Sequence, residues 1–270
     1  MIFRDGVELM KLFIRLNYIV FGYFIVSSVN AFEIGAEFSA EAVQIIPGHP
    51  SMNAKMFISK NAVRTESMVS GNTMVEIVYT KEKRQVLLNQ FSKTYIEQNA
   101  LDNSANSTQV KTTSPCSGLV NVSCKNLGKE KINGRNTTKW EMTTKKNGRD
   151  FKSLHWLDKK YRMPLREQFQ DGTVSTITML GKEVVNSRKT EKWKFIATRP
   201  DGKSVESMQW YDPKLKMVIR EELPGGFIRE LRNIKVAKQD KKLFKIPSEY
   251  KKEVIPAIGQ QRRMMPPRHR

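Results

Sequence analysis

The sequence has few of the residues that usually carry out catalysis, and none of them forms a familiar catalytic motif. Its 270 residues include three histidines, which lie far apart at His49, His155 and His269. There is no Ser-His-Asp arrangement, HExxH zinc motif, glycine-rich phosphate loop or catalytic pair of carboxylates. His155 falls within an alternating strand pattern, and a related segment later in the chain has Gln209 in its place. The sequence therefore predicts a protein that is not an enzyme and holds no cofactor or metal.

Cysteine is equally scarce. Cys116 and Cys124 lie close together in SPCSGLVNVSCKN, a segment rich in small polar residues. A disulfide between them would close a short loop, and such bonds persist in oxidising compartments. The alternative is a pair of metal ligands, but this spacing without a nearby histidine fits zinc poorly. We therefore predict a local disulfide.

Long apolar runs are missing after residue 31, and the one before it is short. Ile19–Val26 (IVFGYFIV) follows a segment with two basic residues and is too short to span a bilayer. Val29 and Ala31 then provide the small residues that a signal peptidase needs at positions −3 and −1. We predict a signal peptide over residues 1–31, cleaved after Ala31, and a periplasmic mature protein. A membrane anchor or a buried strand is the alternative, and Met10 would be a more conventional start than Met1.

No long segment repeats apolar residues at helical spacing. Short alternating or β-branched runs are instead separated by turn residues, and every second residue of Met52–Ser59 (MNAKMFIS) is apolar or small. One apolar face per strand is typical of an antiparallel sheet packed on one side. We predict a mainly β protein with few or no helices and one domain over residues 32–252. Ala36–Ile46 and Asn99–Ser107 are the only weak helical candidates.

The second half of the chain contains an internal repeat. Gly128–Arg135 (GKEKINGR) aligns with Gly181–Arg188 (GKEVVNSR). The match continues through three further pairs, namely Trp140 with Trp193, Trp156 with Trp210, and Asp158 with Asp212. Each copy, at about 128–180 and 181–234, reads as a four-stranded meander joined by tight turns. With six strands before them, the copies predict roughly a dozen strands in one large curved sheet.

Acidic residues are too few to balance the basic ones, and the formal net charge is +20. Between Arg232 and Arg270, twelve basic residues face three acidic ones, a sum of +9. For an exported protein this balance favours an anionic membrane or an envelope protein as partner and argues against nucleic acid. A basic surface that only provides solubility is the alternative. Residues 253–270 are predicted to be a disordered basic tail.

Three segments carry a resemblance to a known family. They are MNAKMFISKNAVRTESMVSGNTMVEIVYTKEKRQVLLNQFSKTYIEQ from Met52, WLDKKYRMPLR from Trp156 and LFKIPSEYKK from Leu243. The chain resembles the periplasmic lipoprotein-carrier superfamily, with its LolA-like and LolB-like proteins and a related periplasmic domain of unknown function, over about residues 36–252. The resemblance implies an incomplete, curved antiparallel barrel whose concave apolar face is covered by short helices. This sequence shows no clear lid helices, and its basic tail and cysteine pair are additions.

Candidate ligand contacts come from the resemblance and from composition. The resemblance implies Arg64 as a binding residue. The 13 methionines recur through the strands, and their flexible side chains suit an adaptable lipid pocket, although core filling is the alternative. We predict Met56, Trp140, Trp193 and Trp210 as pocket walls.

Two function classes follow from these observations. We expect a non-enzymatic periplasmic carrier or sensor that binds a lipid acyl chain or a lipoprotein. The alternative is an envelope interaction or scaffolding module that docks on anionic partners through the basic face formed by Arg232–Arg270.

Overall fold

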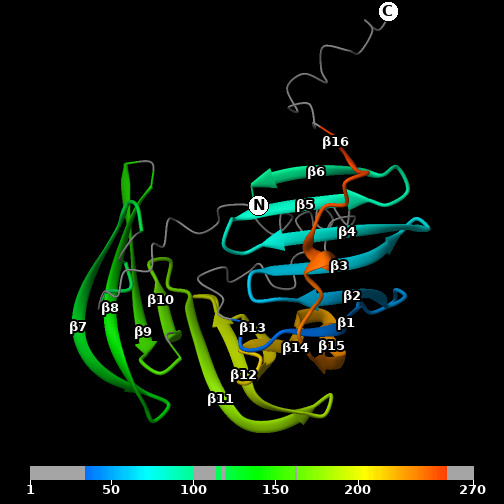
Figure 1. Cartoon of the computed structure of the whole chain (residues 1–270). Coiled ribbons are helices and arrows are strands. Elements are labelled where there is room, and N and C mark those ends of the chain that lie inside the picture. The colour runs from blue at the N-terminus through cyan, green and yellow to red at the C-terminus, as the bar shows by residue number, and fades with distance from the viewer. Residues whose placement is uncertain (1–33, 100–113, 117–118, 147, 162, 254–270) are drawn as a thin grey trace, which may run out of the picture.

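The computed structural model describes residues 34–99, 114–116, 119–146, 148–161 and 163–253. These residues form one sheet of sixteen strands (Figure 1). The only helical elements among them are the short 3-10 turns η2 (Pro224–Gly226) and η3 (Lys241–Phe244). The predicted mainly β class with few helices is therefore confirmed. The predicted signal peptide and nearly all of the predicted basic tail lie outside the described residues.

The strands follow two meanders. The first consists of β1 (Phe38–Ile45), β2 (Met52–Ile58), β3 (Ala62–Val69), β4 (Asn72–Tyr79), β5 (Arg84–Asn89) and β6 (Thr94–Asn99). The second consists of β7 (Val122–Ile132), β8 (Arg135–Lys146), β9 (Arg149–Asp158), β10 (Pro164–Phe169), β11 (Val174–Val185), β12 (Arg188–Thr198), β13 (Ser204–Asp212), β14 (Met217–Leu223) and β15 (Phe227–Val236). A short last strand, β16 (Lys251–Lys252), pairs parallel to β6.

The two meanders meet in the middle of the sheet. The first runs from β1 outward to β6, whereas the second begins at the opposite edge with β7 and returns to β15, which pairs with β1. Strands β7 and β16 are the two edges, so the sheet does not close on itself. Figure 1 shows β1–β6 and β7–β10 on opposite sides, with β11–β15 curving between them. The predicted incomplete barrel is confirmed.

The duplicated meander is also confirmed, and its two copies share the same turn. Asp158 accepts hydrogen bonds from the backbone N–H groups of Lys160 and Tyr161, at 2.8 and 2.9 Å. Asp212, its counterpart, accepts from the two residues at the same positions of its own turn, at 2.8 and 3.1 Å. A carboxylate two or three residues before an N–H group closes such a turn without help from the sheet. The repeated aspartates therefore fix the turn from β9 to β10 in the first copy and from β13 to β14 in the second.

The sheet has two faces, and the residues that are directly paired across strands share one of them. Following those pairs across the sheet places Met56, Trp140 and Trp193 on one face, called face A here. Arg64 and Trp210 lie on the other, called face B. Knowing the face of each residue decides which of the predicted site residues can meet.

Each face carries apolar clusters. Face A of β1 and β2 is buried with residues of β14 and β15, in a cluster that includes Phe38, Met56, Ile58 and Leu231. On face B, the cluster Val75, Ile77, Val86 and Leu88 packs against the segment from η3 onward, with Phe244, Ile246 and Tyr250 in contact with it. Burial of this kind contributes about 25 cal/mol per Å² of apolar surface and is the main stabilising term of the sheet.

Two smaller expectations also have outcomes. Cys116 and Cys124 form a disulfide, as predicted, and it ties the loop before β7 to that edge strand. Within the described part of the chain, no helix is long and apolar enough to cross a membrane.

Candidate ligand-binding groove

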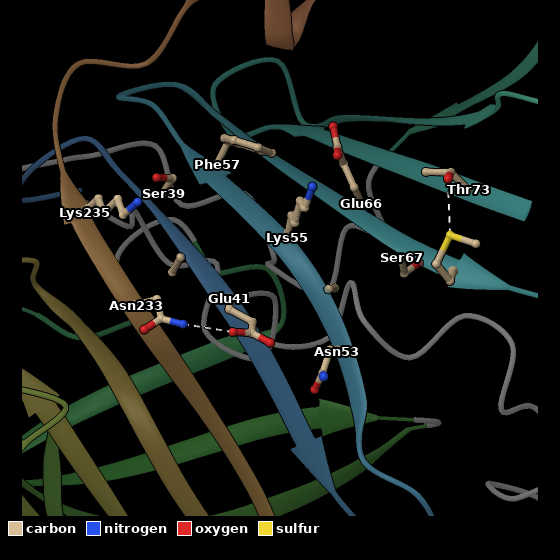
Figure 2. Close-up of a pocket in the computed structure, with 13 residues that line it drawn as sticks. Ser39, Glu41, Asn53, Lys55, Phe57, Glu66, Ser67, Thr73, Asn233 and Lys235 are labelled. Atoms are coloured by element: carbon tan, nitrogen blue, oxygen red, sulfur yellow. Dashed lines mark hydrogen bonds between the residues drawn. The ribbon is translucent and has the colours of Figure 1, made fainter.

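A groove of about 560 Å³ lies on face B where the two meanders join (Figure 2). Its lining residues come from β15, β1, β2, β3 and the start of β4. They are Ser39, Ala40, Glu41, Asn53, Ala54, Lys55, Phe57, Glu66, Ser67, Met68, Thr73, Asn233 and Lys235. A volume of this size lies within the roughly 300–1,000 Å³ range of small-molecule sites.

Strand alternation explains why polar side chains gather here. Ser39 is directly paired with Phe57, and Glu41 with Lys55, so these four side chains leave the same face of β1 and β2. Lys55 is in turn paired with Glu66 on β3. The residues between them point to face A, where they form the core. The same strands thus bury one set of side chains and present the other set in the groove.

Two apolar side chains interrupt the polar lining. Phe57 on β2 is half-buried, and Met68 on β3 is 65% exposed. The Thr73 hydroxyl donates to the Met68 sulfur at 3.3 Å. Phe57 is paired with Arg64, and Met68 lies four residues further along β3, so the ring and the thioether offer two separate apolar contacts to an alkyl chain laid across the strands.

The four charged residues of the groove differ in their pairing. Glu41 accepts a hydrogen bond from Asn233 Nδ2 at 3.1 Å, and Glu66 accepts one from Arg64 Nε at 2.7 Å. Within the described ranges, no acidic side chain forms an ion pair with Lys55 or Lys235. Figure 2 shows these two lysines on either side of β1.

Arg64 connects the groove to the segment around η3. Its side chain is 11% exposed, and while Nε holds Glu66, Nη1 donates to the carbonyl oxygen of Leu243 at 2.9 Å. The Tyr79 hydroxyl donates to the next carbonyl, that of Phe244, at 2.7 Å. The segment from η3 to β16 thereby crosses face B over β3–β5 (Figure 1). Arg64 therefore holds this segment next to the groove.

Replacing Arg64 with alanine should loosen the segment around η3. Loss of two charge-assisted hydrogen bonds from a mostly buried site should lower the free energy of unfolding by about 2 kcal/mol. Hydrogen exchange of residues 241–250 should become faster, while exchange in β8 and β9 should stay unchanged. Arg64→Lys, which keeps a donor and the charge, should show a smaller effect. Equal exchange in the wild type and in Arg64→Ala would contradict this role.

The five residues predicted as ligand contacts are not brought together. Met56, Trp140 and Trp193 are buried on face A, with 1%, 8% and 4% exposure. Trp210 is buried on face B, but on β13, away from the groove. Arg64 is paired with the lining residue Phe57 and does not itself line the groove. None of the five lines the groove. Their role as ligand contacts stays a prediction.

The groove itself was not found from the sequence. Alternation alone indicates that Lys55 and Phe57 leave the same face of a strand. It does not indicate that Asn233 and Lys235 lie beside them, because β1 and β15 are almost 200 residues apart in the chain. The one sequence signal for that pairing is the duplicated meander, because its last strand, β15, needs a neighbour on its free side and pairs with β1.

His155 takes part in a cross-strand link on face A. Its Nε2 lies 2.7 Å from Ser153 Oγ, and its Nδ1 lies 2.9 Å from Glu167 Oε1. In the second copy, Gln209 Nε2 donates to Glu221 Oε1 at 2.8 Å. In its own copy, the glutamine therefore links the two strands that correspond to those linked by the histidine. Among the described residues, no group of three or more His, Cys, Asp or Glu is placed to hold a metal ion.

Comparison with known proteins gives the following matches. A family model described as "Domain of unknown function (DUF4412)" matches residues 42–162. No curated protein matches the chain. A putative outer membrane lipoprotein-sorting protein domain from Vibrio parahaemolyticus is 14% identical, with 78% of this chain and 89% of that chain covered and a TM-score of 0.32. A LolA superfamily protein from Nitrosomonas europaea is 11% identical, with 78% and 90% covered and a TM-score of 0.30.

The chain is similar to LolA superfamily proteins. At this level of similarity the matches carry no ligand and no activity to this chain, so the function has to be inferred from the groove.

Proposed function

We propose that the protein is a non-enzymatic periplasmic carrier or sensor that binds the acyl chain of a lipid or lipoprotein in the face B groove. The observation that carries the proposal is the groove itself, a cavity of about 560 Å³ in which Phe57 and Met68 stand among polar side chains. Apolar contacts supply affinity in such sites, and a few placed polar groups fix the orientation of the ligand.

The position of the groove suits reversible binding. At β1 and β2 the groove lies opposite the face A cluster, so a ligand can enter and leave without opening that cluster. Each CH₂ group of a chain that leaves water contributes about 0.8 kcal/mol. A partly covered chain would therefore bind with moderate affinity, as a protein that must release its cargo requires.

Filling the groove should abolish this binding. Asn53 is exposed on β2 and lines the groove, and its side chain makes no hydrogen bond within the described chain, so Asn53→Trp should place an indole in the cavity without disturbing the fold. Titration with a fluorescent fatty acid should show at least a tenfold loss of affinity relative to the wild type. Tryptophan tolerates strand positions well, which protects the variant from unfolding.

The control is the same substitution at Asn136, an exposed residue of β8 far from the groove. Asn136→Trp should bind the probe like the wild type. Delipidated wild-type protein that neither binds the probe nor carries an acyl ligand in native mass spectrometry would overturn the proposal.

A further inference from the structure

We infer that the groove selects amphiphiles with an anionic head group, a carboxylate or a phosphate, and that Lys55 and Lys235 are its contacts. This inference rests on the proposed function and adds the chemical class of the ligand. It follows from which charges of the groove are already engaged and which are not.

The acidic side chains of the groove are engaged by the protein itself. Arg64 and Glu66 have side chains that are 11% and 22% exposed, and their 2.7 Å contact leaves the carboxylate little need of an external cation. Glu41 is held by the amide of Asn233 on the neighbouring strand. Asn233 itself has a positive φ of 52°, in a stretch where the pairing of β1 with β15 is irregular between Ser39 and Glu41. The bulge therefore turns this amide toward Glu41.

The basic side chains are in the opposite situation. Lys55 and Lys235 are exposed, and neither forms an ion pair among the described residues, although Lys55 is in register with Glu41 and Glu66. An ammonium group offers three donors on a flexible stem, so it can follow an anion of either geometry. The hydroxyl of Ser39 lies in register with Lys235 and adds a neutral donor between the two lysines.

The local sum of charge points the same way. The two lysines and two glutamates that line the groove have a net charge of zero. Arg64, which is ion-paired with Glu66, brings the local net charge to +1. A cationic head group would meet two ammonium groups and two carboxylates that already have partners. A neutral head group would gain nothing from either lysine. An anionic one gains two attractive contacts, each modest because the site is open to water and salt.

Matched amphiphiles with the same chain test the inference. Isothermal titration calorimetry at low salt would compare dodecanoate and dodecyl phosphate with the neutral ester monolaurin. The wild type should bind the two anions about tenfold more tightly than the neutral ester, and added salt should reduce the difference. Lys55→Gln with Lys235→Gln should bring the three ligands within about twofold. Lys129→Gln with Lys131→Gln, which removes the same charge from the exposed edge strand β7, should keep the preference.

Each outcome separates the inference from the proposed function. Equal binding of all three ligands by the wild type, or an unchanged preference in the Lys55 and Lys235 variant, would overturn the inference and leave the carrier function standing. Failure of all three ligands to bind would overturn the carrier function. Inorganic phosphate at the same concentration should not displace dodecyl phosphate. If inorganic phosphate did displace it, Lys55 and Lys235 would bind a free anion and not the head group of an amphiphile, and the inference would also be overturned.

Discussion

Asp212→Ala should lower the free energy of unfolding by about 3–5 kcal/mol, the usual cost of breaking a buried charge pair. Asp212 is 1% exposed and carries three interactions. It pairs with Arg188 Nε through one oxygen and accepts the N–H groups of Lys214 and Leu215 through the other, at 2.8 and 3.1 Å. Its removal leaves a guanidinium that is only 18% exposed without its partner, and two turn N–H groups without an acceptor.

The repeat supplies an internal control for this result. Asp158 makes the same contacts with Arg135 and with its own turn, but the Arg135 side chain is 28% exposed and can be solvated after the change. Asp158→Ala should therefore cost less than Asp212→Ala. Urea unfolding of both variants with the disulfide intact would measure the difference. A loss below about 1 kcal/mol for Asp212→Ala would show that the turn does not depend on its carboxylate.

Trp210→Ala should also cost about 3–5 kcal/mol, the range for removal of a buried aromatic side chain. The ring is 3% exposed and lies between two cations, with Lys192 Nζ 4.8 Å and Arg220 Cζ 5.4 Å from its centroid. Its Nε1 donates to Glu183 Oε2 at 3.1 Å. Truncation removes the packing, both cation–π contacts and the hydrogen bond together.

The conservative variant separates these contributions. Trp210→Phe keeps a ring between the cations and loses the hydrogen bond. It should therefore lower the free energy of unfolding by only about 1 kcal/mol. Trp156 makes the same set of contacts in the first copy, with Lys139, Arg166 and Glu130, and Trp156→Phe should behave alike. Thermal unfolding of both phenylalanine variants would check this. If Trp210→Ala unfolded like the wild type, the contacts of Trp210 with Lys192, Arg220 and Glu183 would have no structural role.

The fold could be predicted from the sequence because its signals are local. Alternation in Met52–Ile58 and the turn residues around it indicate a strand whether or not its neighbours are known. The repeat extends this to a whole meander, since Asp158 and Asp212 mark the same turn twice. The weak helical candidate Ala36–Ile46 is instead strand β1, because its Phe38 and Ala42 alternate into the face A core.

The candidate site was harder to predict because it depends on which distant strands are neighbours. Aromatic and sulfur side chains such as Trp193 and Met56 suit a ligand pocket and a packed core equally well, and composition does not distinguish the two. The groove needs β15 beside β1 and a polar set of residues facing away from the core. Only the strand order shows that Lys235 and Lys55 lie across one groove.

Photo-crosslinking with a diazirine fatty acid tests the central claim most directly, because mass spectrometry identifies the residues that the chain touches. We expect the label on groove residues of β2, β3 and β15, with Phe57, Met68 and Lys235 among them, and we expect Asn53→Trp to remove it. Labelling confined to face A residues, with Met56, Trp140 and Trp193 among them, would contradict the account. It would place the ligand on face A.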